Sequence, residues 1–252
     1  MEDSTRSGDL SGTRFVGANL RGARFVESDL TGVVMRGVEV RGLDIDAPWL
    51  ADGDDGLVVN GVDVTAFVEA ELDRRFPGRS QRYAGDPDGL REAWAALERT
   101  WAATLERVAG MPGGTPDVQV DGEWSFAQTL RHLVLATDVW LRRAVLGVEQ
   151  PFHPLGQVDV GAASVGLDLS VLTTTTPTYA EVLEARADRV ALVRDHLAGV
   201  TADDLAVPRA NPWSPARPET TLSCLHTILE EEWEHHRFAV RDLDSIEAAS
   251  RA

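Results

Sequence analysis

The chain has 252 residues, 43% of them hydrophobic, and a net charge of −17 at neutral pH, with 41 acidic residues against 24 cations that are all arginine. This charge disfavours binding to a nucleic-acid backbone, which needs a basic face, and no apolar run reaches the roughly 20 residues of a membrane span. The polar N-terminus lacks a secretory signal, and the single cysteine, Cys224, excludes an internal disulfide, so we expect a cytoplasmic globular protein. Because nucleic acid and membrane are disfavoured as partners, we expect the protein to act on a small molecule.

The first fifty residues carry a five-residue repeat. A large apolar side chain recurs at every fifth position, namely at Leu10, Phe15, Leu20, Phe25, Leu30, Met35, Val40 and Ile45. Two positions before each lies a mostly small or apolar residue, such as Ala18 or Ala23. A period of five fits neither a helix nor a strand, but it fits a solenoid whose sides use five residues each. The alternative is a turn-rich arm in which the spacing arises by chance.

The run Ala18-Asn19-Leu20-Arg21-Gly22-Ala23-Arg24-Phe25 resembles the pentapeptide-repeat family, whose consensus is Ala-Asp/Asn-Leu-x-x. The resemblance covers residues 6–48 and implies a short right-handed quadrilateral β-helix of two coils. Because a coil buries its faces only against a neighbour, we expect this stub to dock on the rest of the chain. With eight acidic residues and six arginines in the first fifty positions, its net charge of −2 makes it a poor imitation of DNA.

Residues 49–84 form a connector between the repeat and the following helices. Asn60-Gly61 supplies the two positive φ values that a tight hairpin turn needs. Thr65 is expected to N-cap a helix that runs to about Phe76, where Pro77-Gly78 ends it. We interpret the connector as a spacer.

Residues 85–245 predict a bundle of helices. Apolar positions repeat every three or four residues, as on a core-facing helix, over residues 89–108, 125–146, 178–197 and from 221 to about 240. Ser125 is expected to N-cap the second of these helices. A long connection over 147–177 joins the second helix to the third. The fold class is therefore mainly α, a four-helix bundle with one long crossover, in which inward side chains on facing helices can build a metal site.

The last of these helices has a polar break in its apolar seam. The seam runs through Leu222, Leu225, Leu229, Glu232, His236, Val240 and Leu243. Burying Glu232 and His236 without partners would cost several kcal/mol. The inner face of this helix therefore needs a proton, an arginine or a metal ion at these two positions.

His132, in the second helix, can supply a third ligand to this pair. Glu232 and His236 are four residues apart, so their Cβ atoms lie about 6 Å from each other on one helix face. A site of His132, Glu232 and His236 has three nitrogen or oxygen ligands and leaves a fourth position for water or substrate. This pattern is typical of a catalytic zinc-type site.

Each of these residues also has a simpler interpretation. A lone helical histidine such as His132 is more often a hydrogen-bonded core residue. Glu232 can pair with Arg131 or Arg143, and the acidic run 230–234 can be a solvated face. Two further pairs on the last helix compete with Glu232 and His236, namely His226 with Glu230 and Glu231 with His235. Their histidines flank the seam, so they are second choices.

Two segments resemble the DinB superfamily of four-helix-bundle proteins. Residues Trp124 to Leu133 are similar to its second-helix ligand segment, and Leu229 to Arg237 to its fourth-helix segment, usually His-x-x-x-His-Arg. His132 matches the first family histidine and His236 the last, whereas Glu232 stands where the family usually has its middle histidine. The resemblance implies a divalent metal, zinc or nickel, in a site where a carboxylate replaces one imidazole.

The better understood members of that family are low-molecular-weight-thiol S-transferases, thiol-dependent isomerases and metal-dependent hydrolases. We therefore expect a metal-dependent transferase that uses a low-molecular-weight thiol, or a hydrolase. The alternative is a non-catalytic scaffold with a degenerate metal site, whose repeat serves as an interaction surface or joins a homodimer. If the protein is an enzyme, we expect a pocket over His132. If it is a scaffold, we expect an arginine partner for Glu232 in a closed core. Cys224 is expected to be a core residue rather than a nucleophile.

Overall fold

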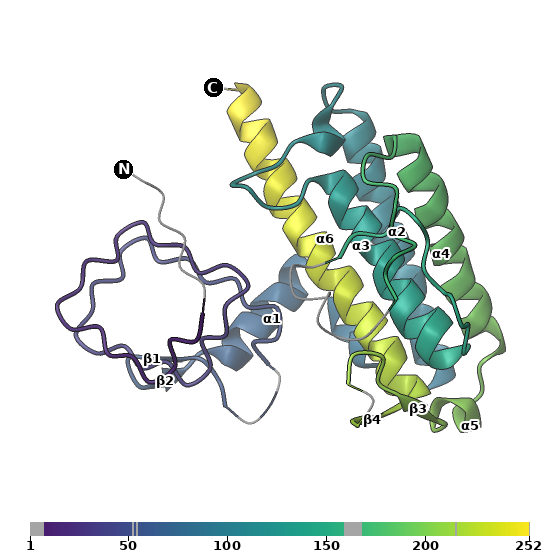
Figure 1. Ribbon diagram of the computed structural model, residues 1–252, viewed down its shortest axis with the longest axis horizontal. Coiled ribbons are helices and arrows are strands. Elements are labelled where there is room, and N and C mark those ends of the chain that lie inside the picture. The colour runs from purple at the N-terminus through teal and green to yellow at the C-terminus, as the bar shows by residue number, and fades with distance from the viewer. Residues whose placement is uncertain (1–7, 52, 54, 159–167, 215, 252) are drawn as a thin grey trace. The chain divides into compact units, whose positions relative to one another are not determined.

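The computed structural model describes residues 8–51, 53, 55–158, 168–214 and 216–251. The chain divides into two compact units, Met1–Asp46 and Ala47–Ala252, and each is described by itself. The first is the short N-terminal β-helix and the second contains the four-helix bundle, so the chain is mainly α-helical, as predicted (Figure 1).

The N-terminal unit has the backbone period that its sequence predicts. A positive φ recurs at every fifth residue from Gly12 to Gly42, with Glu27 taking the place of glycine once. Turn hydrogen bonds recur every ten residues, from the amide of Thr13 to the carbonyl of Leu10 and onward. The large residues of the repeat keep 48–63% of their surface exposed. Their partial burial is expected for a solenoid of so few coils, because each coil needs neighbours to cover it. Docking of this unit on the bundle stays a prediction.

The connector begins with a two-stranded antiparallel hairpin, in which Val59 pairs with Val62 across Asn60-Gly61. Both turn residues have positive φ, as the hairpin prediction requires. The strands are β1 (Val58–Val59) and β2 (Val62–Asp63).

Helix α1 (Thr65–Arg75) follows, with Val64 rather than Thr65 at its N-cap. The prediction of a Thr65 cap was wrong because the Thr65 hydroxyl accepts a hydrogen bond from the Leu57 amide instead. A short 3₁₀ segment, η1 (Arg79–Tyr83), comes next.

Two buried arginines of η1 tie the connector to the bundle. Arg79 donates to Asp73 at 2.9 Å and to Glu234 at 3.2 Å, and Arg82 donates to Glu69 at 2.6 Å. Glu69 and Asp73 belong to α1, whereas Glu234 belongs to the last helix. These ion pairs hold α1 and η1 against the bundle, so this part of the connector is more than a spacer.

Four long helical segments form the bundle. The predicted helices are confirmed with small shifts at their ends, except that the last helix continues to Arg251 instead of ending at about residue 240. They are α2 (Pro87–Ala109), α3 (Phe126–Thr137) continued by the π-helical segment η3 (Asp138–Val145), α4 (Tyr179–Gly199) and α6 (Thr221–Arg251). Helices α2 and α3 each pack against both α4 and α6 (Figure 1). Ser125 caps α3 as predicted, and its hydroxyl forms a capping box with Gln128. The core between these helices includes Trp94, Leu97, Leu130, Leu133, Ile228, Trp233 and Leu243.

Several smaller elements have no counterpart among the predicted ones. They are η2 (Thr115–Asp117), α5 (Ala202–Leu205), and the strands β3 (Pro208–Ala210) and β4 (Pro218–Thr220), which form an antiparallel hairpin before α6. The π-helical character of residues 138–145 was also missed, because the apolar pattern alone reads as one continuous helix.

The described part of the crossover between η3 and α4 is held by two buried side chains of the second helix. Asp138 accepts hydrogen bonds from the Arg189 guanidinium at 2.6 Å and from the His153 amide at 2.7 Å. The Arg131 guanidinium donates to the carbonyls of Leu155, Thr174 and Thr175. These contacts hold the crossover against α3 and η3 both near its start, at His153 and Leu155, and near its end, at Thr174 and Thr175.

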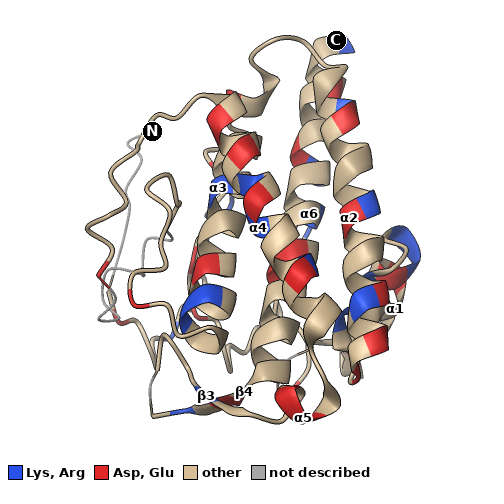
Figure 2. Cartoon of the chain, turned by 90° about the vertical axis from the view of Figure 1, so that its right-hand side faces the viewer, with Lys and Arg blue, Asp and Glu red and all other residues tan. Residues whose placement is uncertain are grey.

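Charged residues of both signs are interspersed along the helices, for example on α2 and α4 in the view of Figure 2. None of the described helices is long and apolar enough to cross a membrane.

Candidate functional site

The structure places Glu232 in the core beside an arginine, away from His132. Glu232 is only 1% exposed. Both of its carboxylate oxygens accept hydrogen bonds from Nη2 of Arg186, on the neighbouring helix α4. Burial raises the pKa of Glu232, and the guanidinium opposes that rise. An arginine partner was the alternative interpretation of Glu232, but the arginine is neither Arg131 nor Arg143.

His236 also lies in the core, against helix α2. Its Nε2 is 2.8 Å from the Thr104 hydroxyl, which itself donates to the Thr100 carbonyl at 3.2 Å. The imidazole therefore acts as the donor to Thr104. The Trp101 ring packs edge-on at 5.0 Å between centroids. Burial lowers the pKa of His236 to about 4, so the ring is neutral at pH 7.

This buried imidazole predicts a pH dependence of stability. In the unfolded chain a histidine binds a proton below about pH 6.5, but His236 in the folded protein does so only below about pH 4. The unfolded state therefore binds more protons between these values. We expect the free energy of unfolding to fall by about 3 kcal/mol as the pH falls through this window. Urea unfolding at a series of pH values measures it. In His236→Gln, which keeps a donor but cannot titrate, this contribution to the slope should disappear, so the curve should be flatter than that of the wild-type protein; parallel curves for the two proteins would contradict the prediction.

The described residues contain one group of three side chains arranged to hold a metal ion: His132 of α3 with Glu231 and His235 of α6. Each offers a ligand atom, and these atoms all lie within 4.8 Å of one another. Oε2 of Glu231 is 3.3 Å from Nε2 of His132 and 3.2 Å from Nε2 of His235. These separations are close to the roughly 3.4 Å expected between ligands of a tetrahedral ion with bonds of about 2.1 Å. The donor set therefore fits a divalent cation.

Both ring nitrogens of His132 face hydrogen-bond acceptors. Nδ1 of His132 lies 3.3 Å from the Gln157 carbonyl, while Nε2 faces the Glu231 carboxylate. Both neighbours are hydrogen-bond acceptors, and a neutral imidazole carries only one N–H. A neutral His132 would leave one nitrogen lone pair facing an oxygen. A second proton or a metal ion on that nitrogen would remove the repulsion between its lone pair and the oxygen. Metal-bound histidines usually donate their other N–H to a carbonyl or carboxylate.

The electrostatics of Glu231 also suit an anionic ligand. Burial raises its pKa, but hydrogen bonds from His132 and His235 outweigh this and bring the pKa well below the ordinary value. The carboxylate is therefore ionised throughout the physiological range. Its side chain is 24% exposed, against 9% for His132 and 14% for His235, so the group lies at the edge of the core.

An aromatic side chain covers the two imidazoles. The Trp124 ring lies 4.9 Å from the His132 ring and stacks on the His235 ring at 6.0 Å, between centroids. Trp124 belongs to the loop immediately before the Ser125 cap. The Phe238 ring meets His235 edge-on at 5.5 Å. These contacts restrict the rotation of both candidate ligands.

The candidate site thus retains His132 but uses α6 in a register one residue earlier than predicted. The structure brings His132 together with Glu231 and His235, and it does not bring it together with Glu232 and His236. The i,i+4 spacing of Glu231 and His235 was visible in the sequence. They were second choices because they lie beside the apolar seam rather than on it. A site that is open to substrate is nevertheless expected at such a half-buried position, not in the closed core.

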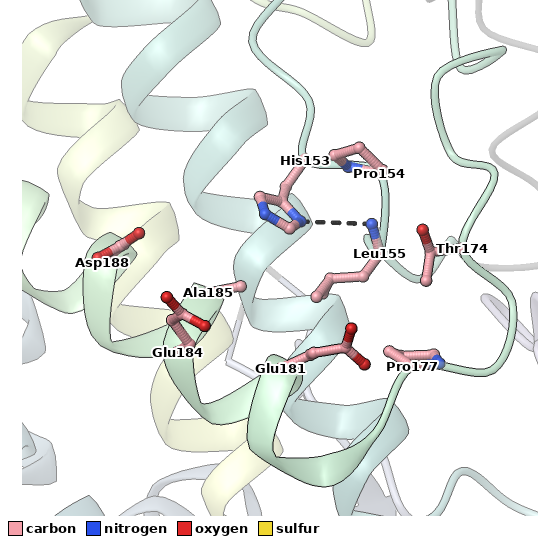
Figure 3. Close-up of a pocket in the computed structure, with 9 residues that line it drawn as sticks. All are labelled: His153, Pro154, Leu155, Thr174, Pro177, Glu181, Glu184, Ala185 and Asp188. Carbon is pink, nitrogen blue, oxygen red and sulfur yellow. Dashed lines mark hydrogen bonds between the residues drawn. The ribbon is translucent and has the colours of Figure 1, made fainter.

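Two cavities lie elsewhere on the bundle, and neither is lined by His132, Glu231 or His235. One, of about 360 Å³, lies between the crossover and α4. His153 stands on one side of it, opposite the carboxylates of α4 (Figure 3). The other, of about 350 Å³, lies between α2 and α4.

Cys224 is fully buried, and burial raises the pKa of its thiol to about 12. The thiol is therefore protonated at neutral pH and unsuited to nucleophilic attack. This confirms the expectation that Cys224 is a core residue.

Comparison with known families agrees with this fold. The family model described as the DinB superfamily matches residues 96–239, which include His132 and both pairs of candidate ligands on α6. The model for pentapeptide repeats matches residues 6–42 in eight copies. No curated protein and no solved structure shows a significant match. With more than half of its length matched, and with the four-helix bundle in place, the chain belongs to the DinB superfamily.

Proposed function

We propose that this protein is a divalent-metal-dependent enzyme whose metal is held by His132, Glu231 and His235. The observation that carries the proposal is the position of His132 between two acceptors, the Gln157 carbonyl and the Glu231 carboxylate. The two histidines and one carboxylate form a donor set that suits zinc and, through their imidazoles, nickel. The reaction class is transfer to or from a low-molecular-weight thiol, or hydrolysis.

In this proposal each residue has a separate task. A bound divalent cation would lower the pKa of a thiol or water molecule and stabilise the resulting anion. Glu231 supplies the negative charge that draws the cation into a site with two neutral ligands. In the metal-bound protein the Gln157 carbonyl would accept from Nδ1–H of His132, so that Nε2, which faces Glu231, would bind the metal. Trp124 packs against both imidazoles and holds their orientation. The three ligands leave one position for the thiol or water.

The second candidate is a non-catalytic scaffold. It is favoured by the buried ion pair of Glu232 with Arg186, because a scaffold predicts an arginine partner for Glu232 in a closed core. It is also favoured by the positions of the two cavities, which lie away from His132. The ion pair concerns Glu232, however, and leaves the neighbouring cluster of His132, Glu231 and His235 intact.

Metal content and metal-dependent chemistry separate these two functions. Protein purified without a His-tag is expected to contain, or to take up, about one zinc or nickel ion per chain, measured by elemental analysis and titration calorimetry. The loaded protein is then incubated with an electrophile and either cysteine or glutathione, and separately with an activated ester. Loss of thiol identifies a transferase, and ester cleavage without thiol identifies a hydrolase.

Glu231→Gln is the matched control, because it keeps the shape of the side chain and removes the charge. It should lose both metal binding and activity. If metal-free wild-type protein takes up neither zinc nor nickel, the proposed enzymatic function is wrong and the scaffold function remains.

A further inference from the structure

The cavity between α2 and α4 is apolar and has no role in the proposed metal site. Its walls come mainly from Leu97, Ala102, Leu105, Leu130, Leu183 and Val190. At its rim, Arg194 of α4 pairs with Glu98 of α2. Its volume of about 350 Å³ falls within the range of small-molecule pockets. An apolar cavity of this size can take a molecule with an aliphatic or aryl body.

Some of the residues that line this cavity carry buried donors without a hydrogen-bond partner within the described structure. Among these donors are Nη1 of Arg186 and the indole nitrogen of Trp94. The Arg186 side chain is 5% exposed and the Trp94 residue 2% exposed, so water does not readily satisfy them. Glu232 accepts only from Nη2 of Arg186, so the other terminal nitrogen, Nη1, has no acceptor within the described structure. Such orphaned donors are costly unless something supplies an acceptor.

We propose that this cavity binds a monocarboxylic acid with an apolar tail, its carboxylate accepting from Nη1 of Arg186. The cavity supplies donors and apolar walls, so its ligand must supply the acceptors. A carboxylate offers two oxygens, and its hydrogen bonds to a guanidinium are stronger than those of a neutral acceptor.

Binding of decanoate to the full-length, metal-free protein tests this proposal by titration calorimetry. Decanol and decyltrimethylammonium serve as probes with the same tail and a neutral or cationic head. We expect decanoate to bind and to be preferred about tenfold or more over either probe. Because no metal is present, the result does not depend on the proposed enzymatic function.

A pair of alanine substitutions on α4 gives the matched control. Ala187 lines the cavity, so Ala187→Phe should fill it and weaken decanoate binding about tenfold or more. Ala198 is exposed on the same helix and lines neither cavity, so Ala198→Phe should leave binding unchanged. The double variant Arg186→Met with Glu232→Met removes the donor without stranding a charge, and it should abolish the preference for decanoate over decanol.

Three results would overturn the proposal. The first is no binding of decanoate to the wild-type protein. The second is equal binding to the wild-type protein and Ala187→Phe, which would place the ligand elsewhere. The third is decanol bound as tightly as decanoate, which would remove the role of the carboxylate and of Arg186.

Discussion

Replacing Arg186 by methionine is expected to lower the free energy of unfolding by about 3–5 kcal/mol, because it leaves the buried Glu232 carboxylate without its partner. The side chains of Arg186 and Glu232 are 5% and 1% exposed, so neither can turn to water for compensation. Urea unfolding at pH 7, followed by circular dichroism, measures the loss. Glu232→Gln should also destabilise the protein, because it takes the charged acceptor away from a buried guanidinium.

Two further variants test the cause of this loss. The double variant Arg186→Met with Glu232→Met removes both charges, so it should be clearly more stable than Arg186→Met alone. Arg194→Met breaks a pair with Glu98 in which the arginine side chain is 55% exposed, and should cost about 1 kcal/mol or less. If Arg186→Met costs no more than Arg194→Met, the buried pair does not contribute as described.

Replacing His235 by alanine is expected to weaken zinc binding by about a hundredfold or more, because two remaining ligands rarely hold the ion. Its side chain lies at the edge of the core, 14% exposed, so the variant should stay folded. Titration calorimetry with zinc on the metal-free protein measures the change, and circular dichroism on the same samples checks folding.

The adjacent histidine provides the control. His236→Gln keeps a hydrogen-bond donor for Thr104 but removes the imidazole. If the metal is held by His132, Glu231 and His235, its zinc affinity should equal that of the wild-type protein. If zinc binding is lost in His236→Gln and kept in His235→Ala, the metal site uses Glu232 and His236, as the sequence alone predicts, and the assignment made from the structure is wrong.

The sequence predicts the fold well because it follows from local patterns. The five-residue period alone predicts the repeat, and the apolar stripes and the Ser125 cap locate the bundle helices. The seam on α6 also identifies Glu232 and His236 correctly as inward-facing, since they are 1% and 4% exposed. The π-helical segment after Thr137 and the hairpin before α6 leave no comparable periodic signal.

The partners of the inward-facing residues could not be predicted from the sequence. Glu232 meets Arg186, 46 positions earlier on another helix, and His236 meets Thr104, 132 positions earlier. Such pairings depend on how the helices are rotated about their axes. The contact between His132 and the Gln157 carbonyl depends in addition on the path of the crossover, which no local pattern specifies.

The neighbouring glutamates of α6 also bear on how this protein can change over evolution. Successive residues of a helix point about 100° apart, so Glu231 lies beside His132 while Glu232 lies beside Arg186. Substitutions at 231 or 235 can therefore remove the proposed metal site while the core persists, and the reverse changes can create one. Among natural homologues, positions 232 and 236 should vary together with residues of the core, such as Arg186 and Thr104. If the proposed metal site exists, positions 132, 231 and 235 should instead be kept or lost as a set.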